Sequence, residues 1–226
     1  MKLVLFDCDG TIVDSQHIII AAMKLAFTAH GIAAPERNEV LSIVGLSLGH
    51  AIQRLLPPGT DESLIALLGE AYKSAFQDLR RDPAHHEPMF AGVRELITAL
   101  AARDDVVLGV ATGKSRRGVA VLFEREGLDE FFTTIQTADD HPSKPHPSMI
   151  LKAMAEVDSR PERTVMIGDT TFDIEMARAA GTSAIGVRWG YHPSELLVAA
   201  GAHVMVDDCQ GLETAIDRLL DSEALV

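Results

Sequence analysis

Two carboxylates directly follow a short apolar segment at the start of the chain. The segment Leu3–Phe6 runs into Asp7 and Asp9, and Gly10 with Thr11 forms a flexible turn after them. Ligands bind at the carboxyl ends of the strands in an open parallel sheet, so both acids would face a ligand there. Side chains two residues apart share a face of an extended strand, and two like charges so close need a cation or a proton between them. Mg²⁺ is the expected cation and Asp7 the candidate nucleophile, although a plain turn is the alternative for this motif taken alone.

Two later segments carry residues suited to binding a phosphate group. Thr112 and Gly113 follow the apolar run Val106–Ala111 and precede a helical pattern. Backbone N–H groups and the dipole at a helix start favour an anion. Lys144 precedes Pro145 in a segment whose prolines restrict the backbone, so a stiff loop would hold its ammonium group. Taken alone, these segments are equally explained as a helix cap and as a helix start with an incidental lysine.

A second pair of acids follows another apolar run. Thr164–Ile167 is followed by Gly168 and Asp169, and Asp173 comes four residues after Asp169. This spacing crosses a turn into a helix, where one acid can bind a cation while the other supports it.

The chain as a whole alternates short β-rich apolar runs with segments of helical period. This alternation predicts an α/β fold with a doubly wound parallel sheet, a Rossmann-like core. Carboxyl ends of parallel strands meet at one edge of such a sheet, so the candidate residues are expected to converge there. The predicted strands are Leu3–Phe6, Val106–Ala111, Thr133–Thr137, Thr164–Ile167, Ala184–Val187 and His203–Val206.

One long segment interrupts the alternation. Between residues 15 and 87 we predict only helices, at Gln16–His30, Ser47–Leu56 and Asp61–Leu79, the last with an apolar stripe at three- and four-residue steps. We therefore expect an α/β core of residues 1–14 and 88–226 and an inserted helical domain of residues 15–87. Ser15 is expected to cap the first inserted helix.

Composition narrows the possible partners. The chain has 226 residues, a formal charge of −13 and 47% hydrophobic residues, as an ordinary globular protein does. Nucleic-acid binding relies on clustered Lys and Arg, so the acidic charge argues against it. The two cysteines cannot build a disulfide framework, and no signal peptide or membrane span is predicted. We expect a cytoplasmic protein, a monomer or a homodimer, with no membrane partner.

The order of these motifs resembles the haloacid dehalogenase superfamily over essentially the whole chain. The four motifs of that superfamily are matched in chain order by Asp7 with Asp9, by Thr112, by Lys144, and by Asp169 with Asp173. The helical insertion is similar to the helical cap of the superfamily. The segments Thr112–Lys114 and Trp189–Tyr191 are most similar to phosphoglycolate phosphatase and its relatives.

The resemblance implies a Mg²⁺-dependent phosphatase that hydrolyses a small phosphomonoester, phosphoglycolate or a similar metabolite. Asp7 would attack phosphorus and form an aspartyl-phosphate, while Asp9 would act first as acid and then as base. Thr112, Gly113 and Lys144 would bind the phosphoryl group. The implied metal ligands are Asp7, the backbone carbonyl of Asp9, Asp169 and, directly or through a second shell, Asp173.

Two alternatives stay open at this point. A phosphosugar mutase of the β-phosphoglucomutase type uses the same four motifs but must also hold a second phosphate, for which the inserted helices offer few cations. A non-catalytic binding or scaffold protein could retain the fold. The carboxylate of Asp9 disfavours relatives that cleave carbon–halogen bonds, because those need no acid for the leaving group.

Overall fold

A six-stranded parallel sheet forms the centre of the computed structural model, which describes residues 1–221. The strand order is β3-β2-β1-β4-β5-β6, with β1 between β2 and β4. This order is doubly wound, as the sequence predicted. Each predicted strand lies within one residue of an observed one: β1 (Lys2–Phe6), β2 (Val106–Thr112), β3 (Phe132–Thr137), β4 (Thr164–Gly168), β5 (Ser183–Val187) and β6 (Val204–Val206).

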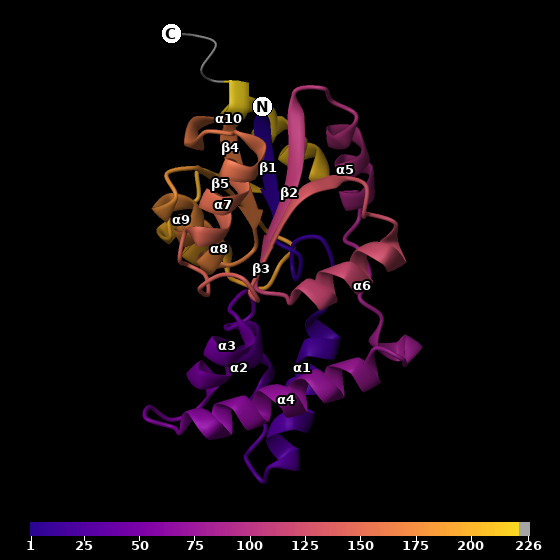
Figure 1. Cartoon of the computed structure of the whole chain (residues 1–226), viewed down its shortest axis with the longest axis vertical. Helices are drawn as coiled ribbons and strands as arrows, with labels where there is room; N and C mark the ends of the chain where they lie inside the picture. The colour runs from indigo at the N-terminus through magenta and orange to yellow at the C-terminus, as the bar shows by residue number, and fades with distance from the viewer. Residues whose placement is uncertain (222–226) are drawn as a thin grey trace.

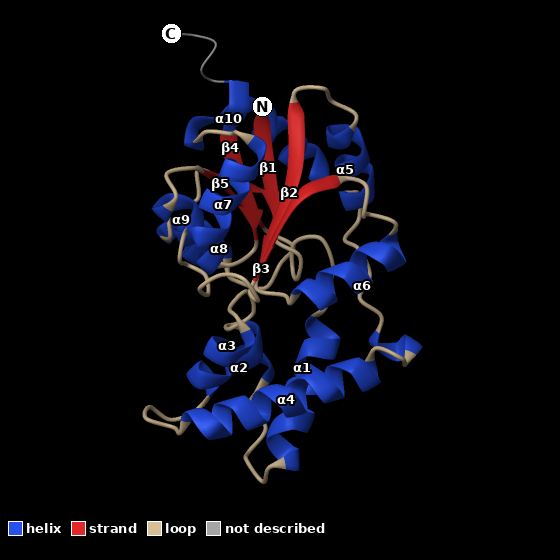
Figure 2. Cartoon of the chain, in the orientation of Figure 1, coloured by secondary structure: helices blue, strands red, loops and turns tan. Residues whose placement is uncertain are grey.

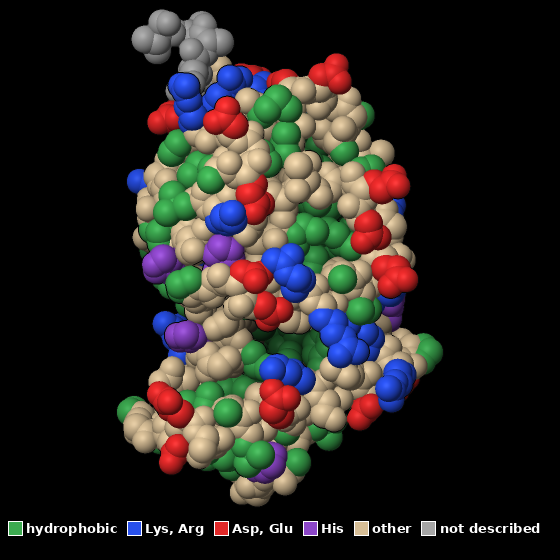
Figure 3. Space-filling model, viewed as in Figure 1, with side chains coloured by type: hydrophobic (Ala, Val, Ile, Leu, Met, Phe, Trp, Pro, Cys, Tyr) green, Lys and Arg blue, Asp and Glu red, His purple; other side chains and the backbone are tan. Residues whose placement is uncertain are grey.

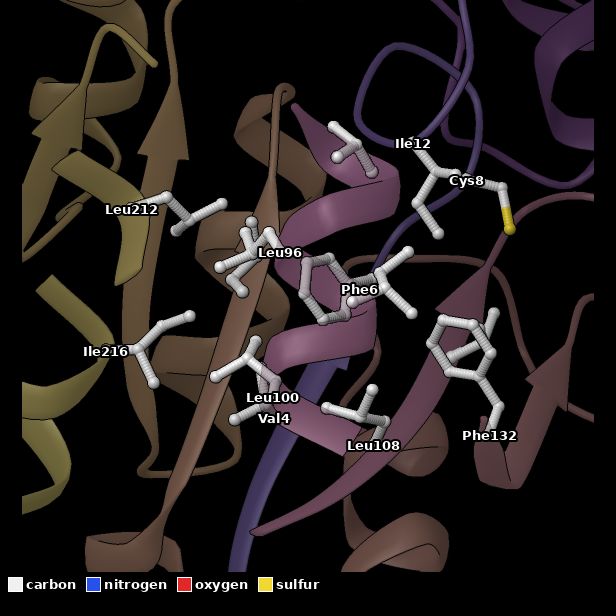
Figure 4. Close-up of a cluster of buried hydrophobic side chains, with 14 of the residues drawn as sticks. Val4, Phe6, Cys8, Ile12, Leu96, Leu100, Leu108, Phe132, Leu212 and Ile216 are labelled. Carbon is white, nitrogen blue, oxygen red and sulfur yellow. The ribbon is translucent and has the colours of Figure 1, made fainter. Parts of the chain in front are cut away.

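Helices cover both faces of this sheet (Figure 2). Alternate residues of β1 point to opposite faces, so Val4 and Phe6 join one hydrophobic cluster and Leu3 and Leu5 join another. The first cluster, part of which Figure 4 shows, also holds Cys8, which confirms that this residue turns away from the acids on either side of it. Its helices are α5 (Val93–Ala101), α6 (Arg116–Glu126) and α10 (Cys209–Asp221), and those of the other face are α7 (Ser148–Val157), α8 (Thr171–Ala179) and α9 (Ser194–Ala199).

The helices between β1 and α5 lie together below the carboxyl ends of the strands (Figure 1). They pack around a third hydrophobic cluster that includes Met23, Ile52 and Leu68. The chain leaves for this part and returns from it side by side, because Asp14 N donates to Pro88 O at 2.8 Å. The elements are α1 (Gln16–Ala29), α2 (Arg37–Leu41), α3 (Leu48–Leu55), α4 (Glu62–Leu79) and the 3₁₀ turn η1 (Pro83–His85).

Two local details differ from the sequence predictions. Helix α2 was missed, because five residues are too few for a periodic apolar pattern to be detected. Ser15 precedes α1, but its side chain does not cap the helix. Among residues 1–221, no helix combines the length and the apolar character that a membrane crossing requires.

Candidate active site

The sheet brings the predicted site residues to one edge, as expected. Asp7 directly follows β1, Thr112 is the last residue of β2, and Asp169 directly follows β4. Lys144 reaches the same edge from the loop between β3 and α7, where its Nζ lies 3.0 Å from Asp7 Oδ1. All four side chains belong to residues no more than 2% exposed. The site is therefore built from buried side chains at the ends of the strands, and their packing fixes its geometry.

Three carboxylates meet in this buried place. Ligand oxygens of Asp7, Asp169 and Asp173 all lie within 4.8 Å of one another. Lys144 Nζ is 2.6 Å from Asp173 Oδ1 in addition to its contact with Asp7. Burial alone would lower the pKa of Lys144, but the carboxylates outweigh it and raise the pKa, so the ammonium stays charged. One ammonium against three acids leaves the cluster short of positive charge.

The cluster fits a hard divalent cation such as Mg²⁺. Burial raises the pKa of Asp7 to about 6, and burial with the nearby charges of Asp173 and Asp7 raises that of Asp169. Both carboxylate oxygens of Asp7 are buried, and apart from the ion pair of Oδ1 with Lys144 they receive no hydrogen bond of good geometry. A divalent cation bound by these oxygen atoms would stabilise the charged form of the crowded acids and would give the Asp7 oxygens a partner. Each oxygen of Asp169 accepts one hydrogen bond, from Thr11 Oγ1 at 3.0 Å and from Tyr191 N at 2.9 Å, and keeps lone pairs for a metal.

Asp173 is the most fully engaged acid of the three. Lys144 donates to its Oδ1, and Thr170 donates to its Oδ2 through both the backbone N–H at 3.1 Å and the hydroxyl at 2.7 Å. Thr170 and Asp173 also form the capping box of α8, so the start of that helix fixes the orientation of the Asp173 carboxylate. The arrangement suits an acid that positions Lys144 and orients the metal ligands without having to bind the metal ion itself.

Asp9 has surroundings of a different kind. Its Oδ1 accepts hydrogen bonds from Ser15 Oγ and from Lys114 Nζ, both at 2.7 Å. Its side chain is 13% exposed and is not part of the three-acid cluster. The predicted cap at Ser15 is thus wrong for a definite reason: the hydroxyl binds Asp9 instead of the helix. The two acids of the first motif differ in environment, as two acids with different roles would.

Sequence reasoning did not identify Glu87, which forms the centre of a buried ion network. Lys114 Nζ lies 3.1 Å from Glu87 Oε1, and Arg80 Nε lies 3.1 Å from its Oε2. Arg125 donates to the backbone carbonyl of Glu87 at 2.7 Å. Because Lys114 also binds Asp9, this network joins the return of the chain from the helical part to the first motif. In the sequence, Glu87 lies beside a proline in a polar segment, the usual context of a solvated linker.

Replacing Glu87 by Gln is expected to lower the free energy of unfolding by about 2 kcal/mol, because it leaves buried cations without their partner. Burial opposes the charge of Glu87, but Lys114 and Arg80 outweigh it and hold its pKa below the usual 4.5. The stabilisation is therefore present above pH 4.5 and is lost as the pH falls through the lowered pKa. Urea denaturation at neutral and acidic pH measures both effects, with the exposed Glu130→Gln as the control. Equal stability of wild type and Glu87→Gln at neutral pH would contradict this account.

A loop of the helical part sits directly against the strand ends. A Cβ atom added to Gly113 would lie 2.5 Å from the carbonyl oxygen of Gly45, too close for any real contact. Ser47 N also donates to Ser143 Oγ at 2.9 Å across the same junction. A cavity of about 540 Å³ lies between the two parts, with Asp7, Asp9 and Thr112 in its lining. Figure 3 shows this hollow, with hydrophobic side chains inside it and basic ones at its rim.

Changing Gly113 to Ala is expected to reduce kcat/KM by about tenfold, because the added methyl group forces the loop around Gly45 away from the site. The midpoint of thermal unfolding is expected to change little, since the loop can move without disturbing the sheet. Steady-state kinetics and a thermal melt measure the two quantities. Gly211→Ala, where the methyl group meets only ordinary contacts, is the control. Full activity in Gly113→Ala would show that the contact does not matter.

Known proteins resemble this chain in sequence and in fold. The family model described as haloacid dehalogenase-like hydrolase matches residues 4–187. The chain is 34% identical to the probable phosphatase IndB of Dickeya dadantii over 96% of this chain and 94% of that protein. It is 29% identical to the pyrophosphatase PpaX of Bacillus cereus, with 94% of each chain covered.

Among solved structures, a hydrolase from Pseudomonas syringae superimposes with a TM-score of 0.85 at 25% identity, covering 96% of this chain and 99% of that one. The family match spans all the predicted site residues, from Asp7 to Asp173. The chain therefore belongs to the haloacid dehalogenase-like hydrolase family and is one of its phosphatases.

Proposed function

We propose that this protein is a Mg²⁺-dependent phosphatase that hydrolyses a phosphomonoester through an aspartyl-phosphate on Asp7. The observation that carries the proposal is the buried Asp7 carboxylate, which belongs to the acid cluster and has Lys144 Nζ 3.0 Å from its Oδ1. The carboxylate receives no hydrogen bond at Oδ2, so it keeps lone pairs there for attack. It faces a cavity large enough for an organic phosphate.

In this proposal Asp7, Asp169 and the backbone carbonyl of Asp9 hold the metal ion, with Asp173 in support. Bound Mg²⁺ would supply the positive charge that lets an anionic phosphate approach an anionic carboxylate. Lys144 is charged and fixed by two carboxylates, so it can neutralise the phosphoryl oxygens without having to reorganise. Thr112 and Gly113 at the end of β2 are the further candidates for binding the phosphate.

Asp9 is the proposed acid and base. An Oδ of Asp7 attacks phosphorus, and the leaving oxygen takes the proton of Asp9 as its bond to phosphorus breaks. Asp9 then removes a proton from the water that cleaves the acyl phosphate, which regenerates both acids. Ser15 and Lys114 hold the carboxylate of Asp9 in place for both steps.

Residues 15–87 are the proposed cap, and residues 1–14 with 88–226 the proposed core. An isolated antiparallel β-bridge between Val13 and Met89 places the two connections next to each other, which suits a hinge. The loop beside Gly113 then closes over the phosphate site and excludes bulk water during the reaction.

Phosphate release from a panel of phosphorylated metabolites with Mg²⁺ tests the proposal. Phosphoglycolate and similar small phosphomonoesters belong in the panel. Release that depends on Mg²⁺ is the expected result. A protein that binds Mg²⁺ but releases phosphate from no compound would instead be a binding or scaffold protein on the same fold.

A further inference from the structure

The cavity beyond the phosphate site is lined mainly by apolar side chains of the helical part. These come from α1, from α4 and from the loop that contacts Gly113. At about 540 Å³ the cavity is far larger than a phosphate group needs and lies in the range of sites for drug-sized ligands, roughly 300–1,000 Å³. The apolar residues include Ile19, Met23, Val44, Leu46, Tyr72 and Phe76.

The basic residues in the inner wall of this cavity are already paired. Lys114 Nζ contacts Asp9 Oδ1 at 2.7 Å and Glu87 Oε1 at 3.1 Å, and its side chain is only 7% exposed. Arg80 is bound to the fully buried Glu87 and lies over the ring of Phe76, 4.9 Å from the ring centroid. Drawing either cation away to a second anionic group of a ligand would leave Glu87 buried with less compensation, which is costly.

The remaining charged residues of the lining do not replace them. Lys73 is paired with Glu70 and is 56% exposed, and Arg117 lies on the exposed start of α6. Asp139, another lining residue, would repel a second anion. Within the described residues, the buried part of the lining thus offers apolar surface and two aromatic rings, and its cations are already paired, whereas Lys73 and Arg117 lie at the exposed rim.

We propose that the substrate is the monophosphate ester of an uncharged organic alcohol, whose apolar or aromatic face packs against Tyr72 and Phe76. This inference rests on the proposed phosphatase activity and refines it. A phosphocarboxylate such as phosphoglycolate, or a bisphosphate such as a phosphosugar mutase holds, would place a second negative charge against buried cations that Asp9 and Glu87 already hold. The pocket disfavours both kinds of ligand, because the free-energy cost of burying a charge without a partner is several-fold larger than the free energy gained from apolar contact.

Three esters of primary alcohols with Mg²⁺ test the inference: benzyl phosphate, 4-carboxybenzyl phosphate and phosphoglycolate. We expect kcat/KM for benzyl phosphate to exceed that for phosphoglycolate by at least about tenfold, since burial of an aromatic ring is worth more than that factor. We also expect kcat/KM for 4-carboxybenzyl phosphate to be lower than kcat/KM for benzyl phosphate, because the added carboxylate carries a negative charge into the cavity. Faster hydrolysis of phosphoglycolate than of benzyl phosphate would overturn this inference and leave the phosphatase intact. No release from any of the three overturns this inference, and only the absence of release from the wider panel overturns the proposed phosphatase as well.

A matched pair of variants on α4 tests whether Phe76 is the residue that contacts the ring of benzyl phosphate. Phe76→Ala is expected to lower kcat/KM for benzyl phosphate about tenfold more than for ethyl phosphate, which has no ring to pack. Using the ratio of the two substrates removes any general loss of activity or folded protein. Leu67→Ala removes a side chain that is 49% exposed on the same helix and outside the cavity lining, and it should leave the ratio unchanged. An unchanged ratio in Phe76→Ala would overturn the assignment of the ring to the substrate.

Discussion

Replacing Asp7 by Asn abolishes phosphate release in our account, with kcat falling by at least about 10⁴-fold, because a neutral amide cannot act as the attacking carboxylate. The variant should fold, since Asn has the shape of Asp and removes one of three crowded acids. Burial raises the pKa of Asp7 to about 6 from 3.8, so ionisation of this group costs stability as the pH rises through that interval. In EDTA at pH 7 the variant should therefore melt no earlier than the wild type.

The control for this substitution is Asp129→Asn, an exposed acid outside the site. It should retain wild-type kinetics and stability. Substantial residual activity in Asp7→Asn, above the background of contaminating phosphatase, would remove Asp7 from the role of nucleophile. Loss of activity accompanied by a lower thermal midpoint would indicate a folding defect rather than a missing nucleophile.

Removal of divalent metal is expected to have an effect of similar size. EDTA should abolish turnover and Mg²⁺ should restore it, because a phosphate dianion must otherwise approach three buried carboxylates with only Lys144 to neutralise them. Mg²⁺ should also raise the thermal midpoint of the wild type by mass action.

Asp169→Asn tests whether the activity and the thermal response to Mg²⁺ both arise from the acid cluster. Asp169 has lone pairs left for a ligand, so its loss should reduce the Mg²⁺-induced rise in the thermal midpoint as well as the activity. Rates that are unchanged in chelator, or a thermal midpoint that does not respond to Mg²⁺ in the wild type, would contradict the metal site.

The sheet and the acid cluster could be predicted from the sequence because both depend on local pattern. All five residues of β1 are buried, since helices cover both faces of the sheet, and a continuous apolar run is the signature of such a strand. Once the strands are parallel, their carboxyl ends coincide. The predicted convergence of Asp7, Thr112 and Asp169 then required no knowledge of side-chain contacts.

The parts that escaped prediction depend on contacts between distant segments. Glu87 is buried among basic side chains from the residue after α4, from α6 and from the turn after β2, and no local pattern carries that information. Ser15 could serve the helix that follows it or the acid that precedes it, and the fold decides in favour of Asp9. The apolar cavity likewise exists only after α1 and α4 have packed below the carboxyl ends of the strands.

The stereochemical course at phosphorus tests the proposed role of Asp7 independently of how much intermediate accumulates. The substrate is a phosphorothioate monoester made chiral at phosphorus by sulfur and two oxygen isotopes, and it is hydrolysed in water of the third isotope so that the released thiophosphate is chiral. Two successive in-line displacements, first by Asp7 and then by water, predict net retention of configuration. Net inversion would mean that water attacks the ester directly and that no aspartyl-phosphate forms.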